Sequence, residues 1–337
     1  MSAAVETLFL PFSSGDVDPP GKGDRFAFLN AASPRAQPDD VLKAALVCEQ
    51  GFRPDFLALQ RAGYQALPEF DAGSMDFAAC LVLVGKHKGE NHATIARACR
   101  LVKPGGTVVV CGDKTLGISS LRKWVSNRVE TAGSLAKHHA TVFWFAAPQG
   151  DAFADAVEPP VLADGRFETA PGMFSHARPD RGSVLLAAQF DARISGAVAD
   201  FGCGWGYLAI HALQAGSPAS LALFDAYYPS LKAAERNLAP VAGSVPVAGH
   251  WIDLTSEPVA RQFDWIVMNP PFHSGRASEP DIGKAFIASA SKALKPGGRL
   301  LMVANRKLPY EQALAQGFRR VEEKVVQDGY KVIEAMR

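Results

Sequence analysis

The residue types best suited to chemistry lie in one segment, Phe263-Asp-Trp-Ile-Val-Met-Asn-Pro-Pro-Phe272. An apolar run leads directly into Asn269 and two prolines, which lack the N–H that a strand ladder needs and fix their own φ angles. We therefore expect the side-chain oxygen of Asn269 and the carbonyl oxygen of Pro270 to lie in fixed relation. Two convergent acceptors suit an –NH2 donor, and Phe272 offers a face on which a flat ring can stack. The segment predicts a site for a planar amine.

The chemistry expected at such a site is alkylation of the amine. The nitrogen lone pair of an arylamine is delocalised into its ring, and two hydrogen bonds from the amine protons favour a more tetrahedral nitrogen. Its lone pair then points at a sulfonium methyl group. The expected mechanism is in-line transfer by positioning and electrostatics, without a covalent intermediate or a metal. We expect Pro271 and His273 to contact the substrate, with His273 shaping the site rather than acting as a base.

A second segment, Asp200-Phe-Gly-Cys-Gly-Trp-Gly206, follows an apolar run and precedes a helical pattern. Glycine permits a sharp turn and the close approach of a ligand, and a helix N-terminus offers unpaired N–H groups. The spacing is G-x-G-x-G rather than the G-x-G-x-x-G of dinucleotide-binding loops. A carboxylate before the first glycine would repel a pyrophosphate but suits the cationic amino-acid end of S-adenosylmethionine. The alternative is a tight turn with packing glycines. The residues of this segment expected to bind the cofactor are Asp200, Gly202, Cys203, Gly204 and Gly206, and Asn269 is expected to contact it as well.

Two further aspartates follow the next predicted strands. Asp225 is placed to accept hydrogen bonds from both ribose hydroxyls of the cofactor, and Asp253 could accept from its adenine amino group. A lone aspartate at a strand end is more often a turn or helix cap, and that alternative stays open for both residues. Cys203 has no evident helper His or Asp, so we expect a small packing residue rather than a nucleophile.

The elements that must position these residues alternate between apolar runs and helical patterns. Such alternation predicts an α/β fold with a parallel sheet covered on both faces and ligands at the carboxyl ends of the strands. The predicted strands are 197–201, 220–224, 263–268, 299–304 and the tail 324–333. The predicted helices are 207–214, 228–238 and about 282–294.

The first half of the chain repeats this order of pieces. Lys103-Pro-Gly-Gly106 and the apolar run after it match Lys295-Pro-Gly-Gly298 and the run that follows. The alternative is that any two α/β sheets share such pieces. The copies differ at the site, because the N-terminal copy has Asn30-Ala-Ala-Ser-Pro34 in place of the glycine cluster and Gly85-Lys-His-Lys88 in place of Asn-Pro-Pro. We predict two tandem doubly wound Rossmann-like domains, over 1–150 and 151–337, joined by the Pro- and Asp-rich stretch 148–164.

Composition limits the cellular setting and the partners. The 337 residues carry 35 Lys and Arg against 34 Asp and Glu, so no global positive field points to nucleic acid, although a local basic patch is compatible with this balance. The sequence has no run of the roughly 18 apolar residues that a membrane helix needs and no secretory signal at its start. The five scattered cysteines predict reduced thiols rather than a metal site or disulfides. We therefore expect a cytoplasmic protein without membrane contact.

The ordered motifs resemble those of class I S-adenosylmethionine-dependent methyltransferases, and the Asn-Pro-Pro-Phe form is similar to enzymes that methylate planar amines in nucleic acids. A narrower resemblance is to the bacterial ribosomal-RNA guanine-N2 methyltransferases of the family called ribosomal RNA small subunit methyltransferase C, and to their relatives that act on the large subunit. The segments that carry it are Asn269-Pro-Pro-Phe-His273 with Ser274-Gly275, Lys295-Pro-Gly-Gly298, Val303-Ala-Asn305, Leu308-Pro-Tyr310, and Pro171-Gly-Met-Phe-Ser175 with Asp180-Arg-Gly-Ser183.

This resemblance implies a degenerate methyltransferase-like domain over 1–150, with an RNA-binding or structural role, and a catalytic domain over 151–337. It implies that Phe174 and Ser175 lie in a loop covering the site and contact the substrate. It also implies cofactor roles for Asp200, Gly202, Gly204, Gly206, Asp225 and Asp253, and target-base roles for Asn269, Pro270 and Phe272. The sequence departs from the family pattern at His176-Ala-Arg-Pro179 and at Trp205.

The function that follows is methyl transfer from S-adenosylmethionine to the exocyclic N2 of a guanine in ribosomal RNA, with 16S favoured. The expected substrate is ribosomal RNA or a small-subunit particle, and the expected state is a monomer. The alternatives are another planar amine (a 23S guanine, adenine N6 or a protein glutamine), a nicotinamide-dependent oxidoreductase and a non-catalytic RNA-binding protein. Tyr207 and the Asn-Pro-Pro-Phe segment argue against the oxidoreductase. Basic residues along Lys114–Arg128 could contact phosphates or form a solvated helix face.

Overall fold

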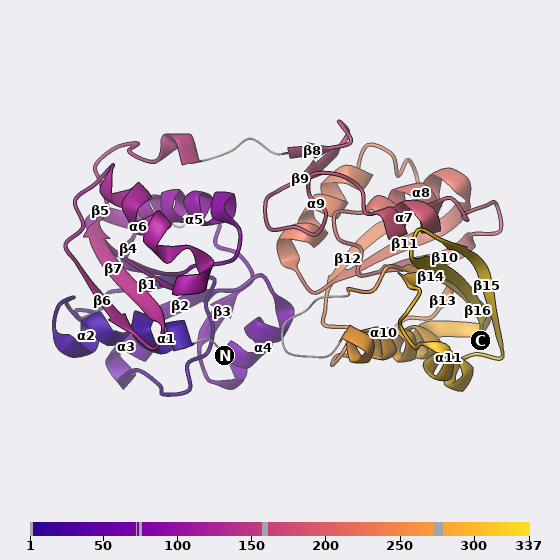
Figure 1. The fold of residues 1–337 in the computed structure, drawn as a ribbon, viewed down its shortest axis with the longest axis horizontal. Coiled ribbons are helices and arrows are strands. Elements are labelled where there is room, and N and C mark those ends of the chain that lie inside the picture. Colours follow the sequence, from indigo (N-terminus) through magenta and orange to yellow (C-terminus); the bar gives the residue numbers. More distant parts are fainter. Residues whose placement is uncertain (1–2, 72, 74–75, 157–160, 272–278) are drawn as a thin grey trace. The chain divides into compact units, whose positions relative to one another are not determined.

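The computed structural model describes residues 3–71, 73, 76–156, 161–271 and 279–337. The chain divides into two compact units, Met1–Pro159 and Pro160–Arg337, and each contains a seven-stranded sheet with helices on both faces (Figure 1). The boundary between the units falls inside the Pro- and Asp-rich stretch at 148–164. In the described part of the chain, no helix has the length and apolar character of a membrane span.

The N-terminal unit has the strand order β3-β2-β1-β4-β5-β7-β6. Its strands are β1 (Phe26–Leu29), β2 (Leu46–Glu49), β3 (Gln65–Leu67), β4 (Phe77–Leu83), β5 (Val102–Asp113), β6 (Gly133–Lys137) and β7 (Ala140–Ala146). Its α-helices are α1 (Ala3–Leu8), α2 (Leu10–Ser14), α3 (Asp40–Ala45), α4 (Arg53–Arg61), α5 (Lys88–Leu101) and α6 (Ile118–Ser126). Helices α5 and α6 pack on one face of the sheet, and α1, α3 and α4 pack on the other.

The C-terminal unit has the corresponding order β12-β11-β10-β13-β14-β16-β15 and a separate hairpin, β8-β9. Its strands are β8 (Val161–Ala163), β9 (Phe167–Thr169), β10 (Ser195–Phe201), β11 (Ser217–Asp225), β12 (Val247–Trp251), β13 (Phe263–Met268), β14 (Leu294–Asn305), β15 (Arg320–Gln327) and β16 (Tyr330–Met336). Its helices are α7 (Arg181–Ala187), α8 (Tyr207–Ala215), α9 (Tyr228–Leu238), α10 (Glu279–Ala293) and α11 (Glu311–Gly317).

The two sheets share their strand directions as well as their order. In each sheet order given above, the first five strands pair in parallel. The sixth strand pairs antiparallel with the fifth and with the seventh. The strand order reverses between β10 and β13, and such a switch point is where open α/β sheets bind ligands, beyond the carboxyl ends of the strands. The predicted fold, two tandem doubly wound Rossmann-like domains, is confirmed.

The cores follow from the alternation of side chains along each strand. In the C-terminal unit Val198 and Val267 pack against α7, α8 and α9. Their strand neighbours Ala199 and Ile266 point to the opposite face and pack against α10 and α11. Since both faces of these parallel strands are buried, they appear in the sequence as continuous apolar runs.

One sequence-based prediction of an element is wrong. The pattern over 324–333 predicts a single strand, but the chain forms the hairpin β15–β16. Asp328 and Gly329 both have positive φ, 52° and 84°. A two-residue turn of this kind matches the twist of an antiparallel pair, and Asp-Gly is one of its favoured sequences. The corresponding β6–β7 hairpin turns at His138 and His139, which have φ of 53° and 60°.

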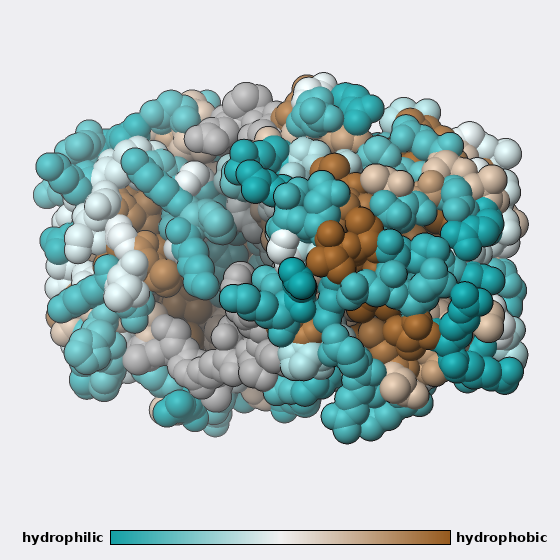
Figure 2. Space-filling view, turned by 45° about the vertical axis from the view of Figure 1, so that its right-hand side comes forward, coloured by the Kyte–Doolittle hydropathy of each residue, from teal (hydrophilic) through white to brown (hydrophobic). Residues whose placement is uncertain are grey.

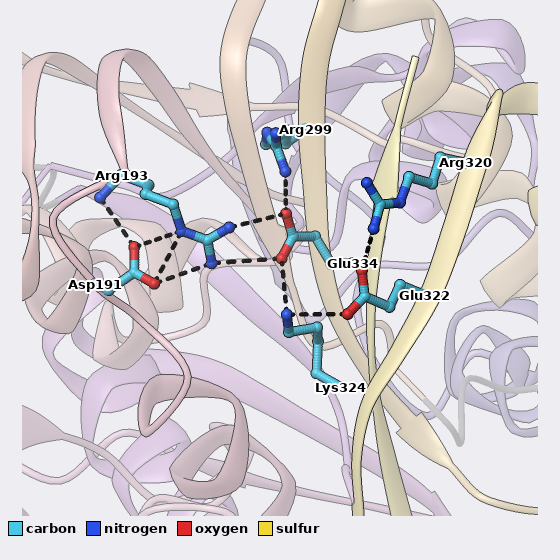
Figure 3. Close-up of polar contacts among 7 residues, drawn as sticks. All are labelled: Asp191, Arg193, Arg299, Arg320, Glu322, Lys324 and Glu334. Carbon is cyan, nitrogen blue, oxygen red and sulfur yellow. Dashed lines mark hydrogen bonds and ion pairs between the residues drawn. The ribbon is translucent and has the colours of Figure 1, made fainter.

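Charged side chains cover the β15–β16 edge of the sheet, and Figure 3 shows them as a network. The carboxylate of Glu334 is only 6% exposed and faces Arg193, Arg299 and Lys324. Arg193 also pairs with Asp191, and Lys324 also pairs with Glu322, which in turn pairs with Arg320. On the face drawn in Figure 2, hydrophilic side chains also predominate, with apolar side chains in separate groups.

Candidate active site

The predicted glycine loop connects β10 to α8 and is fastened to the neighbouring strand. The N–H groups of Gly202 and Cys203 donate hydrogen bonds to the carbonyl oxygen of Phe224, at 2.8 and 3.0 Å. Gly202, Gly204 and Gly206 have φ of +74°, +53° and +93°, a region that glycine occupies without the steric cost other residues meet. The loop therefore needs its glycines for backbone conformation, whatever it binds.

The space around the three glycines differs. A Cβ on Gly206 would lie 2.8 Å from Leu238 Cδ1 and 3.2 Å from Ala234, so this glycine lets α8 and α9 pack closely. A Cβ on Gly204 would meet nothing within 4 Å. Gly204 is therefore the point at which the described residues leave the loop backbone open to a ligand.

Asp225 lies against this loop from the end of β11. Its Oδ2 accepts a hydrogen bond from the Gly204 N–H at 2.8 Å, and its Oδ1 accepts from the Tyr227 N–H at 2.7 Å. Burial raises the pKa of this carboxyl, while the backbone hydrogen bonds oppose the rise. The predicted loop and the predicted strand-end aspartate thus meet at the same carboxyl end of the sheet.

Asp200, near the end of β10, and Cys203, in the loop itself, are both buried. Oδ2 of Asp200 accepts a hydrogen bond from the Ala209 N–H at 3.0 Å, and its Oδ1 has no hydrogen-bond partner among the described residues. Burial raises the pKa of Asp200 to about 8. Burial also raises the pKa of the Cys203 thiol, which keeps it protonated and a poor nucleophile, in line with the expectation from sequence.

Both carboxylate oxygens of Asp253 accept hydrogen bonds within the turn that follows this residue. Oδ1 accepts hydrogen bonds from the N–H and hydroxyl of Thr255, at 2.9 and 2.6 Å, and Oδ2 accepts from the Ser256 hydroxyl at 2.6 Å. This is the turn-forming alternative that the sequence left open. A contact between Asp253 and an adenine stays a prediction.

Asn269 emerges from β13 beside the glycine loop. The backbone carbonyl oxygen of Asn269 lies 4.0 Å from the position that a Cβ on Gly202 would take, so the two predicted segments are neighbours. The side-chain nitrogen donates hydrogen bonds to Asp180 Oδ2 at 2.9 Å and to Ser183 Oγ at 2.8 Å. The side-chain oxygen is buried without a hydrogen-bond partner among the described residues. A carboxylate only accepts hydrogen bonds, so Asp180 fixes which end of the amide is nitrogen.

The remaining predicted substrate contacts are placed in part. Pro270 is buried and Pro271 half-buried, whereas Phe272 and His273 lie outside the described residues. Phe174 is 59% exposed, and the next residue, Ser175, has φ of 52°. The backbone oxygen of Phe174 accepts a hydrogen bond from Trp205 Nε1 at 3.1 Å. Trp205, a departure from the family pattern, therefore ties the segment around Phe174 to the glycine loop.

Similarity to known proteins agrees with this geometry. Residues 164–334 match the family model of the methyltransferase small domain. The ribosomal RNA small subunit methyltransferase C of Pseudomonas aeruginosa is 32% identical over 270 residues, which cover 77% of this chain and 79% of that protein. The Klebsiella pneumoniae protein of the same name is 31% identical over 73% of both chains. This chain belongs to the ribosomal RNA small subunit methyltransferase C family.

A solved structure shares the fold of this family member along nearly its whole length. The 16S rRNA N2 methyltransferase of T. thermophilus, in complex with AdoMet and guanosine, matches with a TM-score of 0.73 at 23% identity. The match covers 99% of this chain and 91% of the other. The sequence-based prediction of a class I S-adenosylmethionine-dependent methyltransferase of this type is confirmed.

The N-terminal unit of this family member has different side chains at the corresponding strand ends. Glu49 ends β2, the position that Asp225 holds on β11. Both carboxylate oxygens of Glu49 pair with the guanidinium of Arg97, and Oε2 also accepts from the Phe70 N–H at 2.6 Å. Asn91 fills the space after β4 by hydrogen bonding in both directions with Gly85, at 2.8 and 3.0 Å. Internal partners thus occupy these polar groups, whereas in the C-terminal unit the side-chain oxygen of Asn269 has no hydrogen-bond partner among the described residues.

Sequence reasoning assigned no role to Asp180 and Ser183, which hold Asn269. Asp180 is the N-cap of α7, since its Oδ2 also accepts from the Ser183 N–H at 3.0 Å. A cap followed by serine three residues later is a local signal that could have placed these residues at a helix start. The sequence contains no signal that this helix start faces Asn269, 89 residues away.

Proposed function

We propose that this protein transfers a methyl group from S-adenosylmethionine to the exocyclic N2 amine of a guanine in ribosomal RNA of the small subunit. The observation that supports this proposal most directly is the fixed orientation of the Asn269 side-chain amide. Asp180 and Ser183 bind its nitrogen, and its buried oxygen is left as an acceptor beside the glycine loop. A buried acceptor without a partner costs about 1–3 kcal/mol, which a donor on the substrate would recover.

The residues around the loop fit the proposed cofactor. Gly204 leaves the backbone open, and the half-buried Asp225 ends β11 beside it, where a ribose would find an acceptor. Asp200 keeps one oxygen without a partner among the described residues beneath the same loop. When bound, S-adenosylmethionine supplies an electrophilic methyl group on a sulfonium. We assign Asp200, Gly202, Cys203, Gly204, Gly206 and Asp225 to its site.

Asn269 would act on the acceptor amine. Its side-chain oxygen, with the Pro270 carbonyl, accepts hydrogen bonds from the amine protons, which reduces delocalisation of the lone pair and orients it for in-line attack. The N–CH3 bond forms as the S–CH3 bond breaks, and the methylated amine then releases one proton to water. Phe272 would stack on the base. The target base must leave its stack to reach these groups.

We assign different roles to the two units because the polar groups at their corresponding strand ends have different partners. We assign catalysis to the C-terminal unit, in which Oδ1 of Asp200 and the side-chain oxygen of Asn269 have no hydrogen-bond partner among the described residues. We assign the N-terminal unit an RNA-binding or structural role, because Arg97 neutralises the acid that would correspond to Asp225. The names of the relatives support ribosomal RNA as the substrate. We further propose that the protein acts as a monomer on 16S rRNA or a small-subunit particle.

The test is methyl transfer from labelled S-adenosylmethionine to 16S rRNA, 23S rRNA and small-subunit particles that lack the modification. Nuclease digestion and mass spectrometry should identify N2-methylguanosine in 16S rRNA. Asn269→Ala should abolish transfer while calorimetry shows that the cofactor still binds. Label in adenosine N6, in 23S rRNA or in protein glutamine would move the proposal to that acceptor. Unchanged turnover by Asn269→Ala would remove the role given to the amide.

A further inference from the structure

A cavity of about 340 Å³ adjoins the fixed amide of Asn269 and has no part in the chemistry described above. It is lined by the segment that follows Phe174 and by the first residue of β16, with Arg178, Asp180, Arg181 and Tyr330 among its residues. Asp180 belongs to the cavity wall and also accepts the Asn269 hydrogen bond at 2.9 Å. The cavity is therefore one side chain away from the acceptor amide.

The cavity lies on the acceptor side of the sheet rather than the cofactor side. Tyr330 pairs with Asn305, at the carboxyl end of β14, and β16 lies two strands beyond β13. Asp225, which faces the glycine loop, ends β11, two strands from β13 in the opposite direction. In the order of the strands, Tyr330 and Asp225 therefore lie on opposite sides of Asn269.

The charge of the cavity favours an anion. Arg178 and Arg181 are exposed, and neither guanidinium forms an ion pair with any described residue. By contrast, the arginines in Figure 3 are neutralised by carboxylates at close range. One acid lines the cavity, Asp180, and its Oδ2 already accepts from Asn269 and Ser183. Two arginines against one acid leave a positive site, and guanidinium groups bind phosphate in a bidentate manner.

The aromatic wall of the cavity offers a second kind of contact. The ring of Tyr330 is half-buried and lies against Gly182, where a Cβ would come within 3.0 Å of two ring carbons. Because Gly182 has no side chain, the Tyr330 ring can pack directly against the backbone of α7. A base that stacks on a fixed aromatic ring gains affinity without sequence preference, because every base has a π face.

We propose that this cavity binds the nucleotide next to the target guanine in the RNA strand, with Arg178 and Arg181 on its phosphate and Tyr330 stacked on its base. This inference rests on the proposed function. Removing the target base from its stack also deprives the neighbouring base of a partner, and the Tyr330 ring replaces that partner. The cavity therefore stabilises the opened strand at the position where the base leaves it.

The first test is the salt dependence of binding to a short single-stranded 16S fragment that contains the target, measured by fluorescence anisotropy without cofactor. Arg178→Gln and Arg181→Gln should each weaken binding about fivefold. Each should also reduce the slope of log K against log salt concentration by about 0.7, the value for one phosphate contact on a single strand. Arg320→Gln is the matched control, since this exposed arginine lies at the far end of the β15–β16 hairpin. It should leave both quantities unchanged.

The second test separates stacking and binding from chemistry. Tyr330→Leu should raise the KM for RNA about tenfold, while kcat at saturating RNA stays within twofold and thermal unfolding confirms the fold. Tyr330→Phe should retain wild-type KM. Wild-type affinity and slope in both arginine variants would overturn the inference even if the wild-type enzyme methylates 16S rRNA. A loss of kcat without a change in KM would also overturn it, because Tyr330 would then act on the chemical step rather than on the binding of RNA. Failure of the wild-type enzyme to methylate any RNA would instead refute the proposed function.

Discussion

The side-chain nitrogen of Asn269 donates a hydrogen bond to Oδ2 of Asp180 at 2.9 Å, and this contact orients the amide to which we assign the binding of the acceptor amine. An amide turned the other way would present a donor to an incoming amine and repel it. Asp180 comes from the start of α7, and Asn269 comes from the end of β13. The orientation of this amide therefore depends on a helix start that lies 89 residues away in the sequence.

Asp180→Asn should impair catalysis without preventing cofactor binding. Asparagine caps a helix as well as aspartate does, so α7 should still form. An asparagine at this position can donate as well as accept, so it no longer fixes the orientation of Asn269. We expect kcat to fall about a hundredfold, the effect that a small misplacement of a catalytic group can have. Single-turnover kinetics measure this, and an unchanged rate would show that another contact orients the amide.

Asp225→Asn should weaken the binding of S-adenosylmethionine. Loss of the charge weakens hydrogen bonds from the ribose hydroxyls, and about 2 kcal/mol corresponds to a roughly 30-fold rise in Kd. Glu49→Gln, at the corresponding strand end of the N-terminal unit, is the matched control, because Arg97 occupies that carboxylate. Calorimetry should show wild-type cofactor affinity for the control. Equal losses in both variants would contradict the assignment of the cofactor to the C-terminal unit.

Alanine at two positions of the glycine loop should separate folding from binding. In Gly206→Ala the new Cβ meets Leu238 and Ala234 at positive φ, and we expect a loss of about 2–4 kcal/mol in the free energy of unfolding. Gly204→Ala has open space around it and should cost only about 1 kcal/mol, from its positive φ. Its new methyl group projects into the space assigned to the cofactor, so Kd should rise at least about tenfold. Urea unfolding and calorimetry distinguish the two outcomes.

Asp200 should make stability depend on pH. Its carboxyl keeps a proton to about pH 8 in the folded protein but loses it near its ordinary value of 3.8 in the unfolded chain. Between these values the folded state holds one more proton, so the free energy of unfolding falls as pH rises, by up to about 1.4 kcal/mol per pH unit, and levels off above pH 8. Asp200→Asn removes this slope. Urea unfolding at pH 5, 6, 7 and 8 tests the prediction through the difference between wild type and variant, which cancels other groups.

Glu334→Gln should destabilise the C-terminal unit. Its carboxylate is nearly buried and faces three cations, so the substitution leaves Arg193, Arg299 and Lys324 without their shared partner (Figure 3). Breaking a buried ion pair costs about 3 kcal/mol. Glu322→Gln, 44% exposed in the same network, should cost much less than Glu334→Gln, because water screens an exposed pair. Similar unfolding midpoints for the two variants would show that burial does not set the strength of this network.

The sequence by itself determined the fold and the location of the site. Apolar runs alternating with helical patterns are local, and the parallel sheet, the glycine loop and the strand exit at Asn269 follow from them. The hairpin turn at Asp328-Gly329 is also encoded locally, although the apolar pattern around it predicts one continuous strand. Repetition of motifs in the same order predicted a second domain of the same kind, and the structure shows that the two sheets have the same strand order.

Only the tertiary structure decided what each polar group does. Asp225, Asp253 and Glu49 all end or follow strands. The N–H groups of Gly204 and Tyr227 bind Asp225, turn groups bind Asp253, and Arg97, 48 residues away, neutralises Glu49. The orientation of Asn269 depends on Asp180, and the cavity beside them depends on Tyr330 meeting Gly182. The physical reason is range. A hydrogen bond or ion pair is decided within about 3 Å, between residues that folding brings together and that sequence spacing leaves far apart.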